Sequence, residues 1–299
     1  MNFLEIKMFK GAITAIVTPF NQDGSLDTES LRSLVEFQIK NKIDGIVPCG
    51  TTGESPTLSH EEHNKVIEAV IDASKGKVPI IAGTGGNSTK QVIDMTKHAA
   101  ELGADASLQV CPYYNKPTQE GLYKHFSEIA KAVDIPIIIY NIQGRTAVNM
   151  ETSTLAGLAK EHSNIVGVKE ASGNLAQMMD VISTLPKDFC VLSGDDNLTF
   201  PLIALGGKGV ISVASNIIPK EMHELATYAL NGQFDKAKKM HYQLLPLFKG
   251  IFIETNPIPI KSALAMKGMI KEVYRLPMCE MKDENKEKLR EILEALRII

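Results

Sequence analysis

The chain has 299 residues, enough for one large domain or two modest ones, and its 44% hydrophobic and 22% charged residues are typical of a soluble globular protein. A net charge of −3 without any long basic block argues against a nucleic-acid partner, because phosphate binding needs a concentrated Lys/Arg surface. The four cysteines are widely spaced, and no apolar run approaches the ~20 residues that span a bilayer. We therefore expect free thiols, a cytoplasmic location and no membrane segment.

A short apolar run, a turn rich in Gly, Ser and Thr, and an amphipathic stretch follow one another repeatedly along the first two thirds of the chain. Several of the runs are nearly continuous in Ile and Val, which is typical of strands buried on both faces of a parallel sheet. Eight strands are predicted: Ala12–Thr18, Gly45–Gly50, Val78–Gly83, Ala106–Cys111, Ile135–Tyr140, Ile165–Lys169, Phe189–Ser193 and Gly209–Val213.

The segments between these runs carry apolar residues at helical spacing. Ser59 and Glu62 are placed to form a capping box ahead of one helix, and Thr118 precedes another. Eight strand–helix units favour an α/β fold, a (β/α)8 TIM barrel, over a doubly wound sheet. Residues 1–218 are expected to carry the strands and the catalytic groups. Residues 219–299 are expected to hold the last barrel helix and an added C-terminal helical region of the same structural unit.

In such a barrel the functional site lies at the carboxyl ends of the strands. Lys169 closes the sixth predicted strand, so its stem starts at the barrel mouth. Its position alone leaves two interpretations, a lysine that reaches past the rim into water and an amine nucleophile that forms a Schiff base with a carbonyl substrate. The nucleophile requires a pKa lowered by roughly three units, or about 4 kcal/mol, which burial can supply.

Hydroxyl-bearing residues end the neighbouring predicted strands. Tyr140 closes the fifth predicted strand. It is either a packing residue whose hydroxyl contacts solvent or a residue whose phenol moves protons during imine chemistry. Thr51 is placed to orient that phenol, and Tyr114 to extend the hydroxyl chain toward solvent. The turn at Thr51 and Thr52 has free N–H groups and hydroxyls that suit a small anion. Arg145 favours a carboxylate there, although a surface ion pair is the alternative for this residue taken alone.

Three patterns suggest cofactors only weakly. Gly83-Thr-Gly-Gly86 is followed by Ser88 where a dinucleotide fingerprint needs its third glycine. His60 and His63 are three residues apart, which does not match the H-E-x-x-H zinc motif. Asp195 and Asp196 point in different directions as consecutive residues, and Asp196 is predicted to cap the next helix. We therefore expect no metal and no cofactor.

Many short stretches, in order along the chain, match one known family. They are Ala15-Ile-Val-Thr-Pro19, Gly50-Thr-Thr-Gly-Glu54, Pro79-Ile-Ile-Ala-Gly-Thr84, Pro112-Tyr-Tyr-Asn115, Tyr140-Asn141, Arg145-Thr146, Gly167-Val-Lys-Glu-Ala171, Leu192-Ser-Gly-Asp-Asp196, Gly209-Val-Ile-Ser212 and Asn256-Pro-Ile-Pro259. On these stretches the chain resembles the dihydrodipicolinate synthase family, in the superfamily of lysine-dependent class I aldolases. The resemblance runs from Phe9 to the C-terminus.

The resemblance implies a lyase of lysine and diaminopimelate biosynthesis. Members condense pyruvate with L-aspartate 4-semialdehyde to 4-hydroxy-tetrahydrodipicolinate, use no cofactor, and form homotetramers built as a dimer of dimers. By position, Lys169 matches the Schiff-base lysine, and Tyr140, Thr51 and Tyr114 match a proton relay whose last tyrosine comes from a neighbouring subunit. The matching substrate-binding positions are Thr52 and Ile211 for pyruvate, Arg145 for the semialdehyde carboxylate, and Gly194.

Two features depart from the family pattern. Ser55, His60, His63, Asn87 and Tyr113 match part of a site where many relatives bind lysine as a feedback inhibitor. Gln91, however, stands where those relatives have a glutamate that pairs with the inhibitor's amine, so the sequence leaves inhibition by lysine open. Residues 1–7 precede the usual family start, which makes Met8 an alternative initiator to Met1.

Two rival functions remain from the sequence. A sibling aldolase, such as N-acetylneuraminate lyase or a 2-keto-3-deoxy acid aldolase, would share the barrel, the lysine and the tyrosine. Arg145 and the Thr51-Thr52 pair favour the synthase. A non-catalytic keto-acid-binding relative is the second rival, and the filled catalytic positions argue against it.

Overall fold

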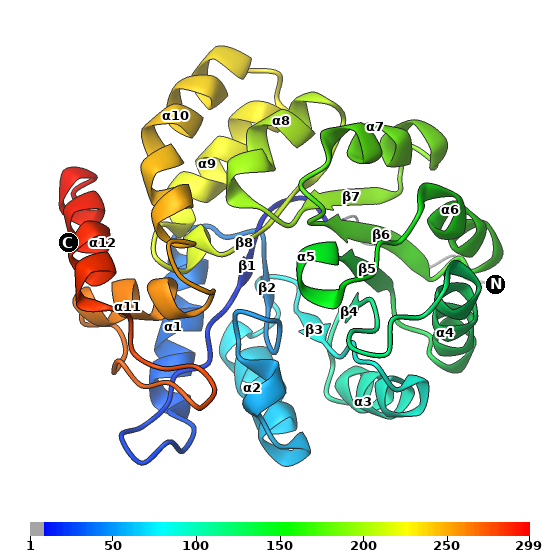
Figure 1. Ribbon diagram of the computed structural model, residues 1–299, viewed down its shortest axis with the longest axis horizontal. Coiled ribbons are helices and arrows are strands. Elements are labelled where there is room, and N and C mark those ends of the chain that lie inside the picture. Colours follow the sequence, from blue (N-terminus) through cyan, green and yellow to red (C-terminus); the bar gives the residue numbers. More distant parts are fainter. Residues whose placement is uncertain (1–8) are drawn as a thin grey trace.

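Eight parallel strands form the centre of the computed structural model (Figure 1). The structure describes residues 9–299, so the two candidate initiators, Met1 and Met8, lie outside the described residues. The sheet order is β2-β1-β8-β7-β6-β5-β4-β3, and a parallel bridge between Ile46 and Ile80 joins the two ends. The predicted TIM barrel is therefore confirmed. The strands are β1 (Gly11–Ala15), β2 (Gly45–Val47), β3 (Ile81–Gly83), β4 (Ala106–Val110), β5 (Ile137–Asn141), β6 (Ile165–Glu170), β7 (Cys190–Ser193) and β8 (Gly209–Ser212).

Helices follow the strands and cover the outside of the barrel (Figure 1). They are α1 (Thr28–Lys40), α2 (His60–Ser74), α3 (Thr89–Glu101), α4 (Gln119–Ala132), α5 (Gln143–Thr146), α6 (Thr152–Glu161), α7 (Leu175–Thr184), α8 (Thr199–Ala204) and α9 (Pro219–Leu230), with single 3-10 turns at Ser55–Thr57, Asp196–Leu198 and Ala214–Asn216. Both halves of the predicted capping box are present at the start of α2, where the Ser59 side chain accepts from the Glu62 N–H. Thr118 caps α4 as predicted.

Two local predictions were wrong. Several strands are shorter than expected at one end: β1 stops at Ala15, and β2 stops at Val47, where a turn begins at Pro48. Asp196 does not cap the next helix. Its buried carboxylate instead accepts from the Ser212 hydroxyl at 2.5 Å and from the N–H groups of Val213 and Ala214 at 3.1 and 3.0 Å, so it ties the end of β7 to the end of β8.

Side chains alternate between the inside and the outside of the barrel. Ile13, Val47, Ile81, Ile138 and Ile211 belong to one buried cluster, to which strands all round the barrel contribute. Their neighbours along the strands pack against the surrounding helices. This alternation explains why the predicted strands are apolar on both faces, and it places Tyr140, a member of the inner cluster, inside the barrel near its mouth.

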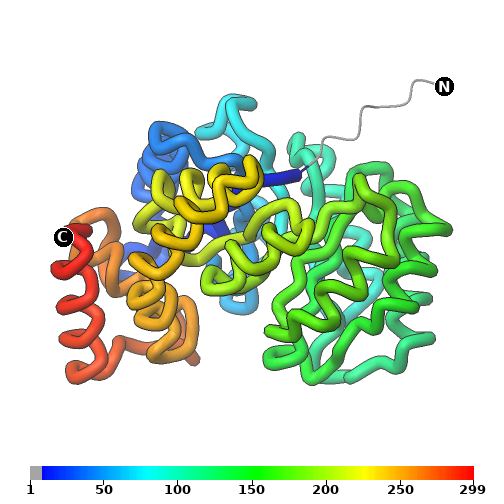
Figure 2. The backbone as a smooth tube through the Cα atoms, turned by 90° about the horizontal axis from the view of Figure 1, so that it is seen from above, coloured from blue at the N-terminus to red at the C-terminus, as the bar shows by residue number. Residues whose placement is uncertain are grey.

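The C-terminal region adds α10 (Phe234–Gly250), α11 (Ile258–Met266) and α12 (Asp283–Ala295) to one side of the barrel. Figure 2 shows this orange and red part at one end of the molecule, opposite the green segments. Leu264 and Leu289 of these helices share one buried cluster with Leu34 and Val70 of the barrel helices. The added region thus packs on the barrel through a common core.

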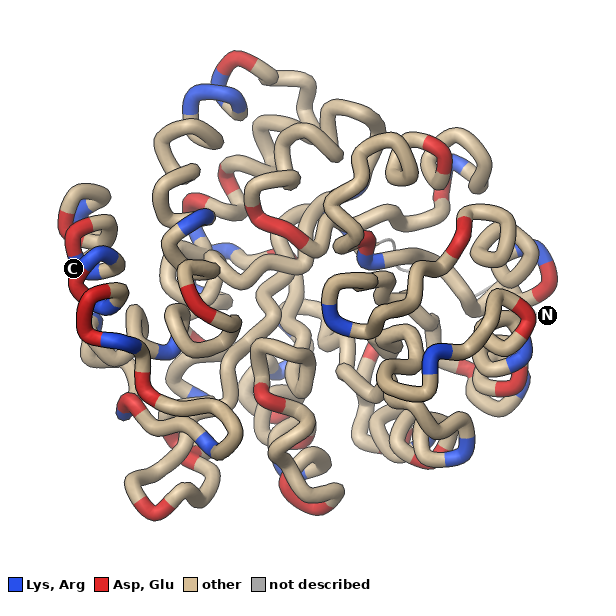
Figure 3. The backbone as a smooth tube through the Cα atoms, viewed as in Figure 1, with Lys and Arg blue, Asp and Glu red and all other residues tan. Residues whose placement is uncertain are grey.

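The outer helices carry charges of both signs. In Figure 3, acidic and basic positions are interspersed along them. No helix within residues 9–299 combines the length and the apolar character needed to cross a membrane.

Candidate active site

Lys169 lies near the end of β6, inside the mouth of the barrel. The strand register pairs it with Tyr140 of β5 on one side and Leu192 of β7 on the other. The residue is only 6% exposed, and its Nζ lies 4.1 Å from the centroid of the Tyr140 ring. The structure therefore brings together the two residues that the sequence singles out for carbonyl chemistry.

The surroundings of Lys169 favour the neutral amine. The pKa of Lys169 is lowered from 10.5 to about 8. Burial is the main cause and the positive charge of Arg145 acts in the same direction, while the carboxylates of Asp195 and Asp196 act in the opposite direction. Burial also raises the pKa of Asp195, which the charge of Lys169 partly offsets. An amine with such a pKa is available as a nucleophile near neutral pH, which an ordinary surface lysine is not.

The Tyr140 phenol is buried and protonated at neutral pH. Burial raises its pKa to about 12, whereas Arg145 and a hydrogen bond with Thr51 act to lower it. The phenol therefore has a proton to give and a hydroxyl neighbour to exchange it with. That combination suits a group that shuttles protons at a reacting carbon.

Gly194 and Ile211 shape the space around the lysine. A Cβ atom on Gly194 would lie 2.4 Å from the Ala171 Cβ and 3.2 Å from the Lys169 Cε, so only glycine fits between them. Its N–H donates to the Glu170 carbonyl at 2.8 Å. Ile211 is fully buried on β8, in the cluster that includes Tyr140.

Thr51 and Thr52 stand in the turn after β2. Thr52 is buried, and its Oγ1 accepts a hydrogen bond from the Asn256 Nδ2 at 3.0 Å. Arg145 belongs to the short helix α5, and its Nη2 donates to the main-chain oxygen of Asn256 at 3.2 Å. Sequence reasoning gave Asn256 no role at the site, and its only signal was the motif Asn256-Pro-Ile-Pro259.

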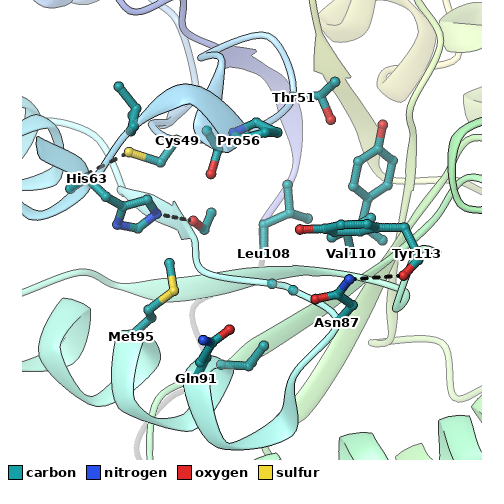
Figure 4. A pocket seen from close by; sticks show the side chains of 18 of the residues that line it. Cys49, Thr51, Pro56, His63, Asn87, Gln91, Met95, Leu108, Val110 and Tyr113 are labelled. Carbon is teal, nitrogen blue, oxygen red and sulfur yellow. Dashed lines mark hydrogen bonds between the residues drawn. The ribbon is translucent and has the colours of Figure 1, made fainter. Parts of the chain in front are cut away.

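A cavity of about 360 Å³ opens beside these residues (Figure 4). Thr51, Tyr140 and Arg145 line one part of it. Every residue of the expected lysine site also lines it, together with Gln91: Ser55, His60, His63, Asn87 and Tyr113. One cavity thus joins the candidate catalytic hydroxyls to the candidate regulatory residues.

Figure 4 shows how two of the candidate regulatory residues are held. The His63 Nε2 lies 2.8 Å from the Gly83 carbonyl oxygen, and burial lowers the pKa of this imidazole. The Asn87 amide donates to the Tyr113 carbonyl at 3.2 Å. These contacts fix the wall of the cavity without using Gln91.

Tyr114 does not join the other site residues within this chain. It is 91% exposed, has a φ of 70°, and is not among the residues that line the cavity. A non-glycine residue in the left-handed region that also exposes an aromatic ring is unusual. Its hydroxyl faces solvent rather than Tyr140 of the same chain.

A buried polar network that we did not predict supports the ends of β5 and β6. Glu170 accepts from the Asn141 Nδ2 at 3.0 Å, from the Gln177 Nε2 at 3.3 Å and from the Ser172 N–H at 2.8 Å. Because Asn141 and Glu170 directly follow Tyr140 and Lys169, this network fixes the strand ends that carry the reactive pair. The only sequence signal was a glutamate immediately after a strand-end lysine.

Comparison with known proteins gives full-length matches. The Dihydrodipicolinate synthetase family profile matches residues 8–296. A 4-hydroxy-tetrahydrodipicolinate synthase of Syntrophus aciditrophicus is 57% identical over 98% of this chain and 100% of its own. The crystal structure of dihydrodipicolinate synthase from Aquifex aeolicus has a TM-score of 0.96 and 52% identity, covering 97% of this chain and 99% of that one.

A second solved structure carries a ligand. The chloride-inhibited dihydrodipicolinate synthase from Acinetobacter baumannii, complexed with pyruvate, has a TM-score of 0.96 and 46% identity, over 97% of this chain and 100% of that one. Sequence and fold agree over almost the whole length of each relative. The chain belongs to the dihydrodipicolinate synthetase family.

Proposed function

We propose that the protein is a 4-hydroxy-tetrahydrodipicolinate synthase that condenses pyruvate with L-aspartate 4-semialdehyde through a Schiff base on Lys169. The observation that carries the proposal is the buried Lys169 amine, with its pKa lowered to about 8, stacked 4.1 Å from the ring of Tyr140. The names of the relatives favour this activity over N-acetylneuraminate lyase and 2-keto-3-deoxy acid aldolase.

The reaction begins at the keto carbon of pyruvate. The neutral Lys169 amine adds to that carbon, and water leaves as the imine forms. The cationic imine nitrogen withdraws electrons, so a methyl proton is lost and an enamine results. Tyr140, hydrogen-bonded to Thr51, gives and takes the protons of these steps.

The second half forms the carbon–carbon bond and releases the enzyme. The enamine carbon attacks the aldehyde of the second substrate, and the aldehyde oxygen takes up a proton. The semialdehyde's own amine then adds to the imine carbon and displaces Lys169 as the ring closes. Lys169 leaves as the free amine, ready for the next pyruvate.

The carboxylates of the two substrates have separate partners in this proposal. The turn at Thr52 holds the pyruvate carboxylate, with Gly194 and Ile211 bounding the pyruvate, and Arg145 receives the carboxylate of the semialdehyde. Thr52 is supported by Asn256, and Arg145 stands on the cavity wall, where a guanidinium can pair with a carboxylate in bidentate fashion.

The same proposal includes assembly and location. Tyr114 is 91% exposed and does not line the cavity that Tyr140 lines, which fits a role in the site of a neighbouring subunit of a homotetramer. Three of the free cysteines are buried and Cys279 is exposed, which suits the reducing cytoplasm. Pyruvate and the semialdehyde are the only ligands the mechanism needs.

Trapping and turnover test the proposal together. The protein is incubated with pyruvate and borohydride, the modified peptide is identified by mass spectrometry, and condensation with aspartate 4-semialdehyde is measured in parallel. We expect a pyruvyl adduct on Lys169 and turnover. Lys169→Arg should abolish both, whereas Lys208→Arg, one residue before β8, should retain both.

The two readouts separate the alternatives. An adduct on Lys169 without condensation would assign the chain to a sibling aldolase and refute the synthase. Absence of an adduct on Lys169 would refute the imine mechanism itself.

A further inference from the structure

Asn256 joins the two substrate-binding elements of the barrel mouth. It is 4% exposed and stands just before α11, in the C-terminal region. Its side-chain Nδ2 donates to the Thr52 Oγ1 at 3.0 Å, across 204 residues of sequence. Its main-chain oxygen accepts from the Arg145 Nη2 at 3.2 Å, across 111 residues. The same residue therefore touches both the Thr52 turn and Arg145.

A second contact fixes the Thr52 turn and the Asn256 segment to each other. The Lys261 Nζ lies 2.5 Å from a carboxylate oxygen of Glu54, and both side chains are buried. The Lys261 N–H donates to the Pro257 carbonyl at 3.0 Å, which ties Lys261 to the residue after Asn256. Glu54 stands two residues after Thr52. The segment from Asn256 to Lys261 thus holds the turn at two neighbouring points, and its position relative to Thr52 is fixed.

The direction of the Asn256 hydrogen bond has a chemical consequence. A threonine hydroxyl has one proton to donate and two lone pairs that accept, whereas a carboxylate only accepts. When the amide of Asn256 donates to Oγ1, it occupies a lone pair and leaves the hydroxyl proton free. That proton can then be given to an anion. The Asn256 Oδ1 is buried and has no hydrogen-bond partner within the described residues. Among those residues, the Asn256 side chain therefore makes one hydrogen bond, the one to Thr52.

We propose that Asn256 is a positioning residue that commits the Thr52 hydroxyl to donate to the carboxylate of the bound keto acid. The inference rests on the proposed function, since it takes pyruvate as the ligand of the turn. Asn256 acts through Thr52 and does not touch the substrate. Its side chain therefore governs the binding of pyruvate, whereas its main-chain contact to Arg145 survives any side-chain substitution.

The test compares Asn256→Ala and Asn256→Asp with the wild type. The rate of borohydride-trapped imine formation is measured against pyruvate concentration, and the KM for the semialdehyde is measured at saturating pyruvate. Asn231→Asp, at the exposed end of α9, is the control for an amide-to-carboxylate change.

We expect Asn256→Ala to raise the half-saturating pyruvate concentration about tenfold, the scale of one hydrogen bond that serves a charged ligand. Asn256→Asp should raise it further, because a carboxylate can only accept from Thr52 and so withdraws the hydroxyl proton from the substrate. The rate at saturating pyruvate and the KM for the semialdehyde should change by less than about threefold.

A double-mutant cycle separates positioning from general support of the fold. If Asn256 acts through Thr52, Asn256→Ala should add less than about a twofold effect in a Thr52→Val background. A full tenfold effect in that background, or an unchanged half-saturating concentration in Asn256→Ala alone, would overturn the inference. The alanine variant carries the test if the aspartate variant does not fold, because truncation buries no charge.

The outcomes also separate this inference from the proposed function. If the wild type forms the imine and Asn256→Ala has the same half-saturating pyruvate concentration, the inference alone would be overturned. Wild-type protein that forms no imine would overturn both. Wild-type protein that forms the imine but does not condense the semialdehyde would refute the synthase and leave the role of Asn256 measurable with pyruvate.

Discussion

Replacing Asp195 by asparagine is expected to shift the reactivity of Lys169 to lower pH. The negative charge of Asp195 raises the pKa of Lys169 and so opposes the lowering caused by burial. Without that charge, burial and the positive charge of Arg145 should lower the pKa of Lys169 further than in the wild type. Asparagine keeps the shape of the side chain, so the change is mainly one of charge.

The wild-type pKa sets the size of the effect that must be detected. A drop from 10.5 to about 8 corresponds to about 3 kcal/mol. At pH 7 about a tenth of such an amine is neutral, compared with about 0.03% of an amine with an ordinary pKa. The surroundings of Lys169, burial above all, therefore raise the reactive fraction about 300-fold.

The assay is the initial rate of pyruvate imine formation, trapped with borohydride, between pH 6 and about 10. The wild-type rate should rise with pH and level off above an inflection near pH 8, and the Asp195→Asn inflection should lie lower. Asp188→Asn, an exposed aspartate before β7, should titrate like the wild type. An inflection above about pH 9 in the wild type, or one that moves upward in Asp195→Asn, would refute the reasoning.

Three further predictions concern stability and regulation. Lys169→Met should raise the free energy of unfolding at pH 7 by up to about 3 kcal/mol, because no ammonium has to be desolvated. In the unfolded chain the lysine keeps the higher pKa, so the stability gained by Lys169→Met should shrink between about pH 8 and pH 10.5. Urea unfolding at several pH values measures this gain. A gain that grows with pH would contradict the prediction. Lys261→Met should cost about 3–5 kcal/mol in urea unfolding because it removes the ion-pair partner of the buried Glu54 carboxylate, and adding Glu54→Gln should restore most of the loss. Gln91→Glu should strengthen lysine binding by about 1.5–3 kcal/mol in calorimetry, because a carboxylate then faces the cavity; equal affinities would place lysine elsewhere.

The barrel and its reactive pair were predictable because they depend on local sequence. Runs of Ile and Val mark strands buried on both faces, and in a parallel barrel the end of each strand faces the mouth. Lys169 and Tyr140 each stand one residue before the end of adjacent strands, so their proximity followed from strand order alone. The strand ends were less accurate, because no side-chain period distinguishes the last strand residue from the first residue of the turn.

Other parts of the site depend on contacts that no periodicity reveals. The bond from Asn256 to Thr52 links residues 204 positions apart, and Asn256 lies outside the eight strand–helix units. Asp196 looked like a cap because it precedes a helix, yet its carboxylate reaches the end of β8 instead. Whether the exposed Tyr114 meets a partner is a property of an assembly, which a single chain does not define.

The position of Asn256 and Lys261 late in the chain affects how the protein folds during synthesis on the ribosome. Thr52 leaves the ribosome early, whereas Asn256 follows 204 residues later, an interval of about 10–40 s at ~5–20 residues per second. During that time the six remaining strands, β3 to β8, join β1 and β2, but the turn lacks both of its supporting contacts. The nascent barrel can therefore close before its anion-binding turn is complete, and binding competence arises only when translation is nearly finished.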